Sequence, residues 1–380
     1  MLNQDNIKTE HPRTVLEMIK QMSELGVEEK DNEKWLWRYL EDKARRDYIP
    51  LHGKFELTPL CNLDCKMCYV HLENKLFPVE KLISAQVWIS IIDAARKMGM
   101  MEATLTGGEC LTCPGFDEIY LHLYSHGILT SILSNGVLMD QKRVEFFKRY
   151  PPKGIQITLY GSNEDAYEAV TGHRVFKNVM EGIERLLDAG LRVIIMITPN
   201  AYMQDDTQEI IRIAEEFGIH YHISSALLSP RENTGRRKAE TNEELIMDLF
   251  RARQEYRKKQ AVIRELCDVP FPNQRSDGET TEGVLCGAGR SNFAIMYDGR
   301  MSPCLAIDNI TTRPIEQGFQ KAWKELTEKM NHYQRPVECN RCAYRQVCLP
   351  CPAIHQEAPQ GHCDVRICQR IYRMAVEGLI

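Results

Sequence analysis

Long hydrophobic runs are missing from this sequence of 380 residues. No stretch approaches the roughly 18 consecutive apolar residues that a membrane-spanning helix needs. The first ten residues, MLNQDNIKTE, also lack the apolar centre of a secretory signal peptide. The two absences predict a cytoplasmic protein without a membrane partner.

An excess of positive charge is missing as well. There are 48 Lys and Arg residues against 53 Asp and Glu residues, which gives a formal net charge of −5. Proteins that bind nucleic acid usually carry a basic balance, so we expect no nucleic-acid partner. Low-complexity tracts are absent, and the hydrophobic content of 43% is ordinary for a globular enzyme.

Cysteine, by contrast, is abundant, with 14 residues. Disulfides are rare in a reducing compartment, so metal ligation is the first expectation. Cys61, Cys65 and Cys68 form the pattern C-x3-C-x2-C directly after a β-rich stretch at 54–58. Three thiolates on one loop can hold three corners of a cubane iron–sulfur cluster and leave one iron open to a small molecule. A zinc knuckle is the alternative, although zinc sites usually come as two C-x2-C hooks.

Apolar segments of strand and helix type alternate from residue 54 onward. The predicted strands are Lys54–Thr58, Ala103–Thr106, Leu129–Leu133, Ile155–Leu159, Arg192–Thr198 and Tyr221–Ala226. The predicted helices are Ser84–Lys97, Phe116–Ser125, Gln141–Arg149, Phe176–Ala189 and Thr207–Phe217, with capping glycines at Gly99, Gly127, Gly190 and Gly218. Six βα units predict an α/β fold with a parallel sheet, and they are too few for a closed eight-stranded barrel. We therefore expect a partial, open (β/α)6 barrel.

Polar motifs stand at the carboxyl ends of the predicted strands, where parallel α/β proteins bind ligands. Thr106-Gly-Gly-Glu109 follows the second strand, and its carboxylate is suited to an ammonium group. Leu133-Ser-Asn-Gly136 ends the third strand and Thr158-Leu-Tyr-Gly161 ends the fourth.

The cysteine triplet followed by Gly-Gly-Glu resembles the radical S-adenosylmethionine (radical SAM) superfamily. The resemblance implies that Cys61, Cys65 and Cys68 ligate a 4Fe–4S cluster whose open iron binds SAM. It also implies a partial (β/α)6 radical SAM barrel, a flavodoxin or ferredoxin reductant, and cleavage of SAM to a 5′-deoxyadenosyl radical. The cofactor-binding residues that it implies are Gly107, Gly108, Glu109, Ser134, Asn135, Thr158 and Arg174.

Nine further cysteines follow residue 260. Cys286 is followed after twelve residues by a G-x4-C element that runs from Gly299 to Cys304, and the run Tyr297-Asp-Gly-Arg300 predicts a hairpin turn there. Residues 339–351 read C-x2-C-x5-C-x2-C. This order resembles the SPASM extension of radical SAM enzymes, which carries one or two auxiliary 4Fe–4S clusters and usually has x3 before the last of these cysteines. The resemblance implies a nearer cluster on Cys286, Cys304 and Cys351, and an outer one on Cys339, Cys342 and Cys348 with Cys363 or Cys368. A structural zinc ribbon over 339–351 is the alternative, and the spacing leaves the role of Cys267 open.

SPASM proteins mostly modify peptides or proteins. The resemblance therefore predicts an oxidoreductase that forms an intramolecular thioether or carbon–carbon crosslink in a ribosomally made peptide. An anaerobic sulfatase-maturating enzyme is an alternative, but those enzymes have Asp where Leu305 stands here. An enzyme acting on a small molecule and a non-enzymatic electron carrier are further alternatives.

The resemblance divides the chain into four parts: a helical segment (1–50), the partial barrel (51–240), a bridging helix (241–262) and the SPASM domain (263–380). No catalytic acid or base is assigned, although Arg231, Glu232 and His222 stand near the end of the sixth predicted strand. Cys110 and Cys113 lie beside Glu109 and outside the common pattern.

Overall fold

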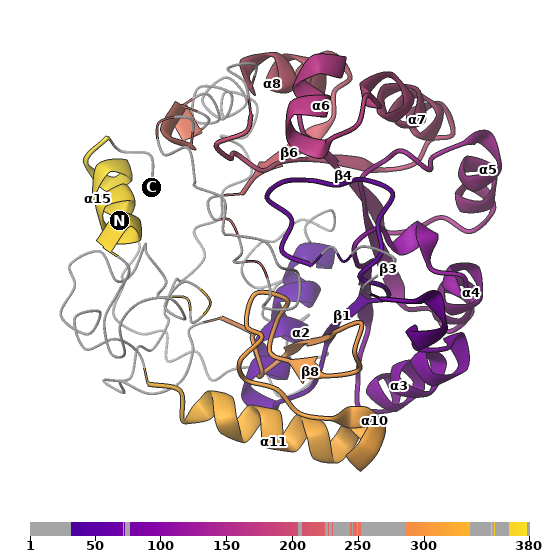
Figure 1. Cartoon of the computed structure of the whole chain (residues 1–380). Coiled ribbons are helices and arrows are strands. Elements are labelled where there is room, and N and C mark those ends of the chain that lie inside the picture. Colours follow the sequence, from indigo (N-terminus) through magenta and orange to yellow (C-terminus); the bar gives the residue numbers. More distant parts are fainter. Residues whose placement is uncertain are drawn as a thin grey trace.

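An eight-stranded sheet forms the centre of the computed structural model, in the order β6-β5-β4-β3-β2-β1-β7-β8. The structure describes residues 32–70, 72, 77–203, 207–224, 227, 230, 244, 246–248, 250–251, 286–334, 351, 353 and 365–377. Helices cover the outer side of the curved sheet (Figure 1). The expected parallel α/β architecture is therefore confirmed.

Six strands run parallel in chain order. They are β1 (His52–Glu56), β2 (Glu102–Thr106), β3 (Leu129–Ser134), β4 (Gly154–Leu159), β5 (Val193–Ile197) and β6 (His220–Ile223). Each corresponds to a predicted strand. The buried positions of these strands are filled by the β-branched and aliphatic residues that strands prefer, and these residues made the strands recognisable.

The helices between these strands fall mostly where they were predicted. They are α3 (Ala85–Lys97), α4 (Phe116–Ser125), α5 (Gln141–Arg149), α6 (Glu164–Thr171), α7 (Phe176–Asp188) and α8 (Thr207–Glu216), with 3₁₀ turns η2 (Val79–Lys81) and η3 (Cys110–Thr112). Ser84 caps α3 and Asp140 caps α5 by accepting a hydrogen bond from the backbone three residues on. The four predicted capping glycines all have positive φ, between 62° and 107°. Only α6 was not predicted.

The two faces of the sheet differ in chemistry. On the helix-covered face, Phe55 of β1 contacts Trp88 of α3, and Leu105 of β2 is buried in the same hydrophobic core. Lys54 of β1 is paired in register with Thr104 of β2, and Thr104 with Ser131 of β3, so these polar side chains share the opposite face. We call this concave side the lumen face.

The cysteine-rich C-terminal region is joined to this same sheet. β7 (Asn292–Ile295) pairs in parallel with β1 over four residues, and β8 (Met301–Ser302) returns antiparallel to β7. The predicted hairpin turn at 297–300 is confirmed, with Gly299 at φ 83°. After this hairpin come α10 (Pro314–Gln317) and α11 (Phe319–Asn331), and α15 (Val365–Val376) lies further along the chain.

The N-terminal helix α2 (Asn32–Asp47) leads directly into β1. Trp37 of this helix meets His52 edge to face at 6.0 Å, and Trp323 of α11 donates a 2.7 Å hydrogen bond to the carbonyl of Tyr48. These contacts hold α2 at the amino end of the lumen face, behind β1 and β8 in the view of Figure 1.

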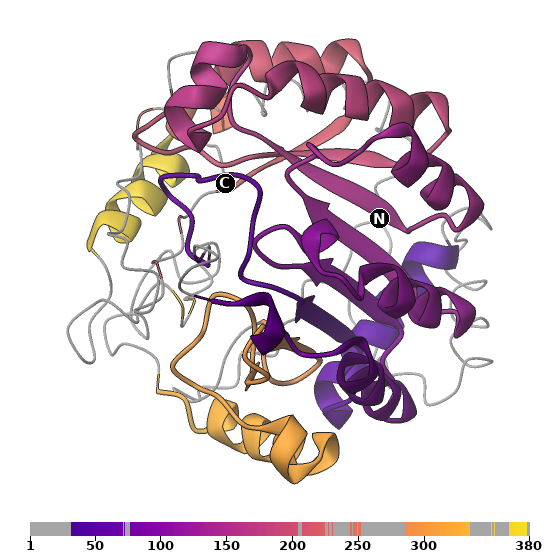
Figure 2. The same cartoon turned by 45° about the vertical axis from the view of Figure 1, so that its right-hand side comes forward.

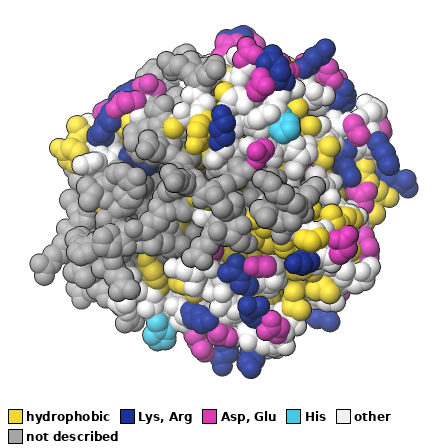
Figure 3. All heavy atoms as spheres, viewed as in Figure 1, with side chains coloured by type: hydrophobic (Ala, Val, Ile, Leu, Met, Phe, Trp, Pro, Cys, Tyr) yellow, Lys and Arg dark blue, Asp and Glu magenta, His cyan; other side chains and the backbone are white. Residues whose placement is uncertain are grey.

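Acidic and basic side chains are interspersed over the described part of the face drawn in Figure 3. Within the described ranges, no helix combines the length and the apolar composition needed to cross a membrane.

Candidate functional site

The cysteine loop leaves the carboxyl end of β1 and is fastened to the end of α6, as Figures 1 and 2 show. The amides of Asp64 and Lys66 donate 3.0 Å hydrogen bonds to the carbonyls of Thr171 and Val170. A helix leaves its last carbonyls without partners inside the helix, so the loop satisfies them. The same contacts fix the backbone between the three cysteines.

The three thiols of Cys61, Cys65 and Cys68 come close to one another on this loop. All three act electrostatically on the hydroxyl of Tyr160, whose pKa is raised first by burial and then by these neighbours. Burial, and after it the neighbouring Glu109, raises the pKa of Cys61 to about 12. A metal ligand must lose this proton, and bound metal favours that loss. Three sulfur donors on one fixed loop fit three irons of a cubane cluster.

Gly107 and Gly108 let the end of β2 pack directly against the cysteine loop. The amide of Gly108 donates a 2.7 Å hydrogen bond to the carbonyl of Thr58, and the amide of Glu109 donates one of 2.9 Å to the carbonyl of Leu60. A Cβ on Gly107 would lie 2.5 Å from the Thr58 oxygen, and one on Gly108 would lie 2.3 Å from the Leu60 oxygen. The glycines were predicted for their approach to a ligand, and the structure shows a close approach to the loop backbone.

The Glu109 carboxylate is buried and joins the ends of β2 and β3. It accepts hydrogen bonds from the amide of Asn135 at 2.8 Å, from the amide of Leu111 at 3.1 Å and from the Ser134 hydroxyl at 3.1 Å. Burial raises its pKa, while the bonds from Asn135, Leu111 and Ser134 act in the opposite direction. Glu109 therefore has a visible positioning role, and its predicted contact with SAM stays a prediction.

Asn135 carries this network on to the first cysteine. Its Nδ2 donates to Oδ1 of Asn62 at 2.8 Å and approaches Sγ of Cys61 at 3.6 Å. The amide of Leu63 also donates to this sulfur, at 3.4 Å. Hydrogen bonds to a sulfur stabilise its thiolate and tune a cluster that it holds. Ser134 and Asn135 were both predicted, and the structure places them beside Cys61 and Glu109.

The two remaining predicted cofactor residues differ in position. Thr158 is half-buried on the lumen face near the end of β4. Arg174 is exposed, and its guanidinium forms ion pairs with Asp165 and Glu168 of α6. Among the described residues, those ion pairs are the only charged contacts of Arg174, so its predicted role in binding SAM stays without structural support.

We expect the substitution Arg174→Met to leave SAM cleavage within about twofold of wild type, because exposed ion pairs contribute little. The measurement is the rate of 5′-deoxyadenosine formation as a function of SAM concentration. A tenfold rise in the SAM KM would instead return Arg174 to the cofactor site.

A second group of cysteines gathers beside β7 and β8. Cys304 follows β8, and its pKa is raised to about 11, first by burial and further by Cys351 and Cys286. Lys54 of the lumen face acts on Cys304 in the opposite sense. The three cysteines assigned to the nearer auxiliary cluster are thus neighbours in space, although they span 66 positions of the sequence.

The other predicted auxiliary ligands are mostly outside the described residues. These are Cys339, Cys342, Cys348 and Cys363, as are the open candidate Cys267 and the two residues Arg231 and Glu232. Cys368 is described and is exposed on α15. Cys110 and Cys113 are both buried, and the thiol of Cys110 contacts the carbonyl of Leu133 at 3.4 Å.

Tyr160 and Asn62 were not among the predicted site residues. Asn62 directly follows Cys61, and Tyr160 lies two residues after Thr158. Only the fold shows that their side chains turn toward the cysteines. The signal was present in the motifs themselves, Cys-Asn-Leu-Asp-Cys and Thr-Leu-Tyr-Gly, but was not specific to a contact.

Comparison with known proteins agrees with this geometry. Residues 55–214 match the Radical SAM superfamily. Residues 55–214 therefore form a radical SAM domain. Members of the superfamily use a 4Fe–4S cluster together with SAM, and the cysteine loop of this chain suits both.

Individual relatives are distant. The sporulation killing factor maturation protein SkfB of Bacillus subtilis is 26% identical over 68% of this chain, which spans 60% of SkfB. A probable GTP 3′,8-cyclase of Aeropyrum pernix is 27% identical over 66% of this chain and 72% of its own length. The structure of SuiB from Streptococcus suis with its precursor peptide SuiA has a TM-score of 0.64 at 16% identity, covering 92% of this chain and 88% of SuiB. At that identity the likeness shows the fold alone, and the fold is that of a radical SAM enzyme.

Proposed function

We propose that this radical SAM enzyme is an oxidoreductase that matures a ribosomally made peptide by an intramolecular crosslink, a thioether or a carbon–carbon bond. One observation carries the first half of this proposal. Cys61, Cys65 and Cys68 are held on one loop at the carboxyl end of a parallel strand, beside the Glu109 and Asn135 network.

The residues of this network have distinct proposed roles. Cys61, Cys65 and Cys68 hold the cluster, and Asn135 and the amide of Leu63 stabilise the sulfur of Cys61. Glu109 and Ser134 hold the β2 and β3 ends in register with the loop. When bound, the cluster supplies the electron that cleaves SAM to a 5′-deoxyadenosyl radical. The remaining proposed SAM contacts are Gly107, Gly108 and Thr158.

The proposed peptide substrate rests on the relatives and on the auxiliary cysteines. SkfB is a maturation protein, and SuiB was solved with a precursor peptide. An oxidative crosslink removes two hydrogens, so the substrate radical must pass on an electron, and clusters on Cys286, Cys304 and Cys351 and on the outer cysteines would accept it. A flavodoxin or ferredoxin is the proposed reductant. Because one relative is a probable GTP 3′,8-cyclase, a small-molecule substrate is the alternative.

The test uses anaerobically reconstituted enzyme with SAM, a reductant and short peptides encoded beside its gene. We expect 5′-deoxyadenosine formation and a peptide product lighter by two hydrogens, with fragment ions that locate the crosslink. Formation of 5′-deoxyadenosine without any change of mass in those peptides would favour a small molecule. Absence of 5′-deoxyadenosine would reject the enzyme function itself.

The triple variant Cys286→Ala/Cys304→Ala/Cys351→Ala tests the auxiliary role. We expect it to lose about four irons per chain and to keep cleaving SAM, while forming no crosslink, because only the route for the substrate electron is removed. Iron analysis and product mass spectrometry measure both effects. The variant Cys113→Ala is the control, since this buried cysteine lies outside both groups and should leave the iron content unchanged. Full crosslinking by the triple variant would contradict the proposed electron route.

A further inference from the structure

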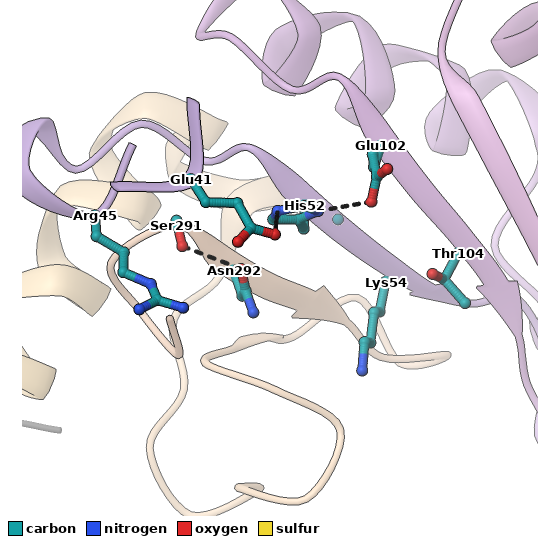
Figure 4. A pocket seen from close by; sticks show the side chains of 9 residues that line it. Glu41, Arg45, His52, Lys54, Glu102, Thr104, Ser291 and Asn292 are labelled. Carbon is teal, nitrogen blue, oxygen red and sulfur yellow. Dashed lines mark hydrogen bonds and ion pairs between the residues drawn. The ribbon is translucent and has the colours of Figure 1, made fainter. Parts of the chain in front are cut away.

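A polar cavity of about 230 Å³ lies at the amino end of the lumen face, bordered by α2, β1, β2 and the start of β7 (Figure 4). Drug-sized ligands usually occupy larger pockets, so this volume suits a single side chain or small anion. The lining residues are Glu41, Arg45, His52, Gly53, Lys54, Glu102, Thr104, Ser291 and Asn292.

The acidic residues of this cavity already have partners. Nδ1 of His52 lies 2.9 Å from the Glu102 carboxylate, and its Nε2 lies 3.7 Å from that of Glu41. Glu102 also forms an ion pair with Lys153. Burial acts to raise the pKa of Glu102, but the bonds from His52 and Lys153 outweigh it and hold that pKa below its usual value.

The two remaining cations have no such partner. Among the described residues, neither Arg45 nor Lys54 forms an ion pair with a carboxylate. The Nε–H of Arg45 is shielded from solvent and has no hydrogen-bond acceptor within the described part of the chain. A shielded donor without an acceptor is costly, so this atom calls for a ligand oxygen.

Asn292 adds a neutral donor between these cations. Its Oδ1 faces the hydroxyl of Ser291 at 3.1 Å, which leaves its Nδ2 for the cavity. Figure 4 shows Arg45, Asn292 and Lys54 pointing their nitrogen atoms to the same side, away from the His52–Glu102 pair. Two cations and an amide that line one side of the cavity favour an anion, and a carboxylate can accept a bidentate bond from arginine.

We propose that this cavity binds the side-chain carboxylate of an Asp or Glu residue of the peptide substrate through Arg45, Lys54 and Asn292. The peptide as the source of the carboxylate rests on the proposed function, while the anion site itself does not.

The position of the cavity fits an anchor for a substrate. Lys54 precedes Thr58, where the cysteine loop begins, by four residues of extended chain. At about 3.3 Å per residue the anchor lies roughly 13 Å below the start of the cysteine loop. An extended peptide would span this gap with about four residues, so the modified residue should lie about four positions from the bound carboxylate.

The test is an affinity selection that needs no turnover. Anaerobic holoenzyme is mixed with two pools of random, end-blocked decapeptides, which carry either Glu or Gln at one fixed central position, and retained peptides are counted by mass spectrometry. We expect the wild type to retain the Glu pool about tenfold better, the order of one charge-assisted hydrogen bond. Lys54→Met and Arg45→Met should abolish this preference, and Lys54→Arg should keep most of it. Arg46→Met, an exposed arginine on the same helix, is the matched control and should behave as wild type.

Iron content and circular dichroism establish that each variant is folded. Equal retention of the two pools by wild type, or an unchanged preference in Lys54→Met, would overturn the proposal. Acetate or phosphate alone is the alternative occupant: a rise in melting temperature with either anion in wild type but not in Lys54→Met, without any preference for the Glu pool, would reject the peptide source. Failure of SAM cleavage in the wild type would reject the proposed function and leave the binding result standing.

Discussion

Alanine at Cys61, Cys65 and Cys68 together is expected to abolish SAM cleavage and to remove about four of the roughly eight to twelve irons bound by the wild type. The loop that carries these cysteines is held by the carbonyls of Val170 and Thr171. Its backbone should therefore persist without the sulfur atoms, so the loss reports on ligation and not on unfolding. Iron and sulfide analysis with a 5′-deoxyadenosine assay measures the effect.

Cys110→Ala is the control for this variant. Cys110 is as buried as any cysteine of the site and lies beside Glu109, but it is outside the triplet. It should keep the full iron content. Zinc in place of iron in the wild type, with no SAM cleavage, would show that the spacing belongs to a structural metal site.

The substitution Gly108→Ala is expected to cost the enzyme the same cluster through sterics alone. Its Cβ would meet the backbone of Leu60 and Pro59, with separations of 2.3 to 2.7 Å. Backbone atoms cannot turn aside as a side chain can, so the end of β2 and the cysteine loop must move apart. Overpacking of this kind costs about 1–3 kcal/mol or more. We expect a loss of about four irons, no SAM cleavage and a lower melting temperature.

Gly154→Ala is the matched control, because Gly154 is a buried glycine of β4 in the same sheet. Its added Cβ would find its nearest neighbour at 3.7 Å, an ordinary contact distance. The iron content should be unchanged and the free energy of unfolding should shift by less than about 1 kcal/mol. A Gly108→Ala protein with wild-type iron content would mean that the loop can yield more than this packing suggests.

The barrel strands and most of their helices were predictable because each carries a local signal. The buried faces of strands such as β4 and β5 are aliphatic. Helices such as α4 and α5 were predicted with the same first and last residues that the structure shows. The short helix α6 was missed, since eight residues give too few turns for a clear apolar period. Its N-cap Asn163 and its left-handed C-cap Gly172 were the available signs.

The partners of the C-terminal region could not be read from the sequence. The turn around Gly299 predicted a hairpin, but nothing in residues 292–295 says that they pair with β1, more than two hundred residues earlier. The same holds for the cavity at Arg45 and Lys54, which brings together side chains from four separate elements. Arg174 shows the opposite case, a residue whose motif position suggested a ligand contact while the fold pairs it with α6.

The pairing of β7 with β1 limits how this chain can be shortened. A fragment that stops near residue 262 would lack β7. The edge of β1 that pairs with β7 would then be exposed, with the backbone of four residues unpaired. Exposed edges of parallel sheets invite pairing between molecules, so such a fragment should aggregate on expression. The strand that delivers Cys61 would also lose its neighbour, and iron incorporation should fall even though every cysteine of the triplet is still present. Protein engineers who want the minimal catalytic unit of this enzyme should therefore keep the hairpin of β7 and β8 in it.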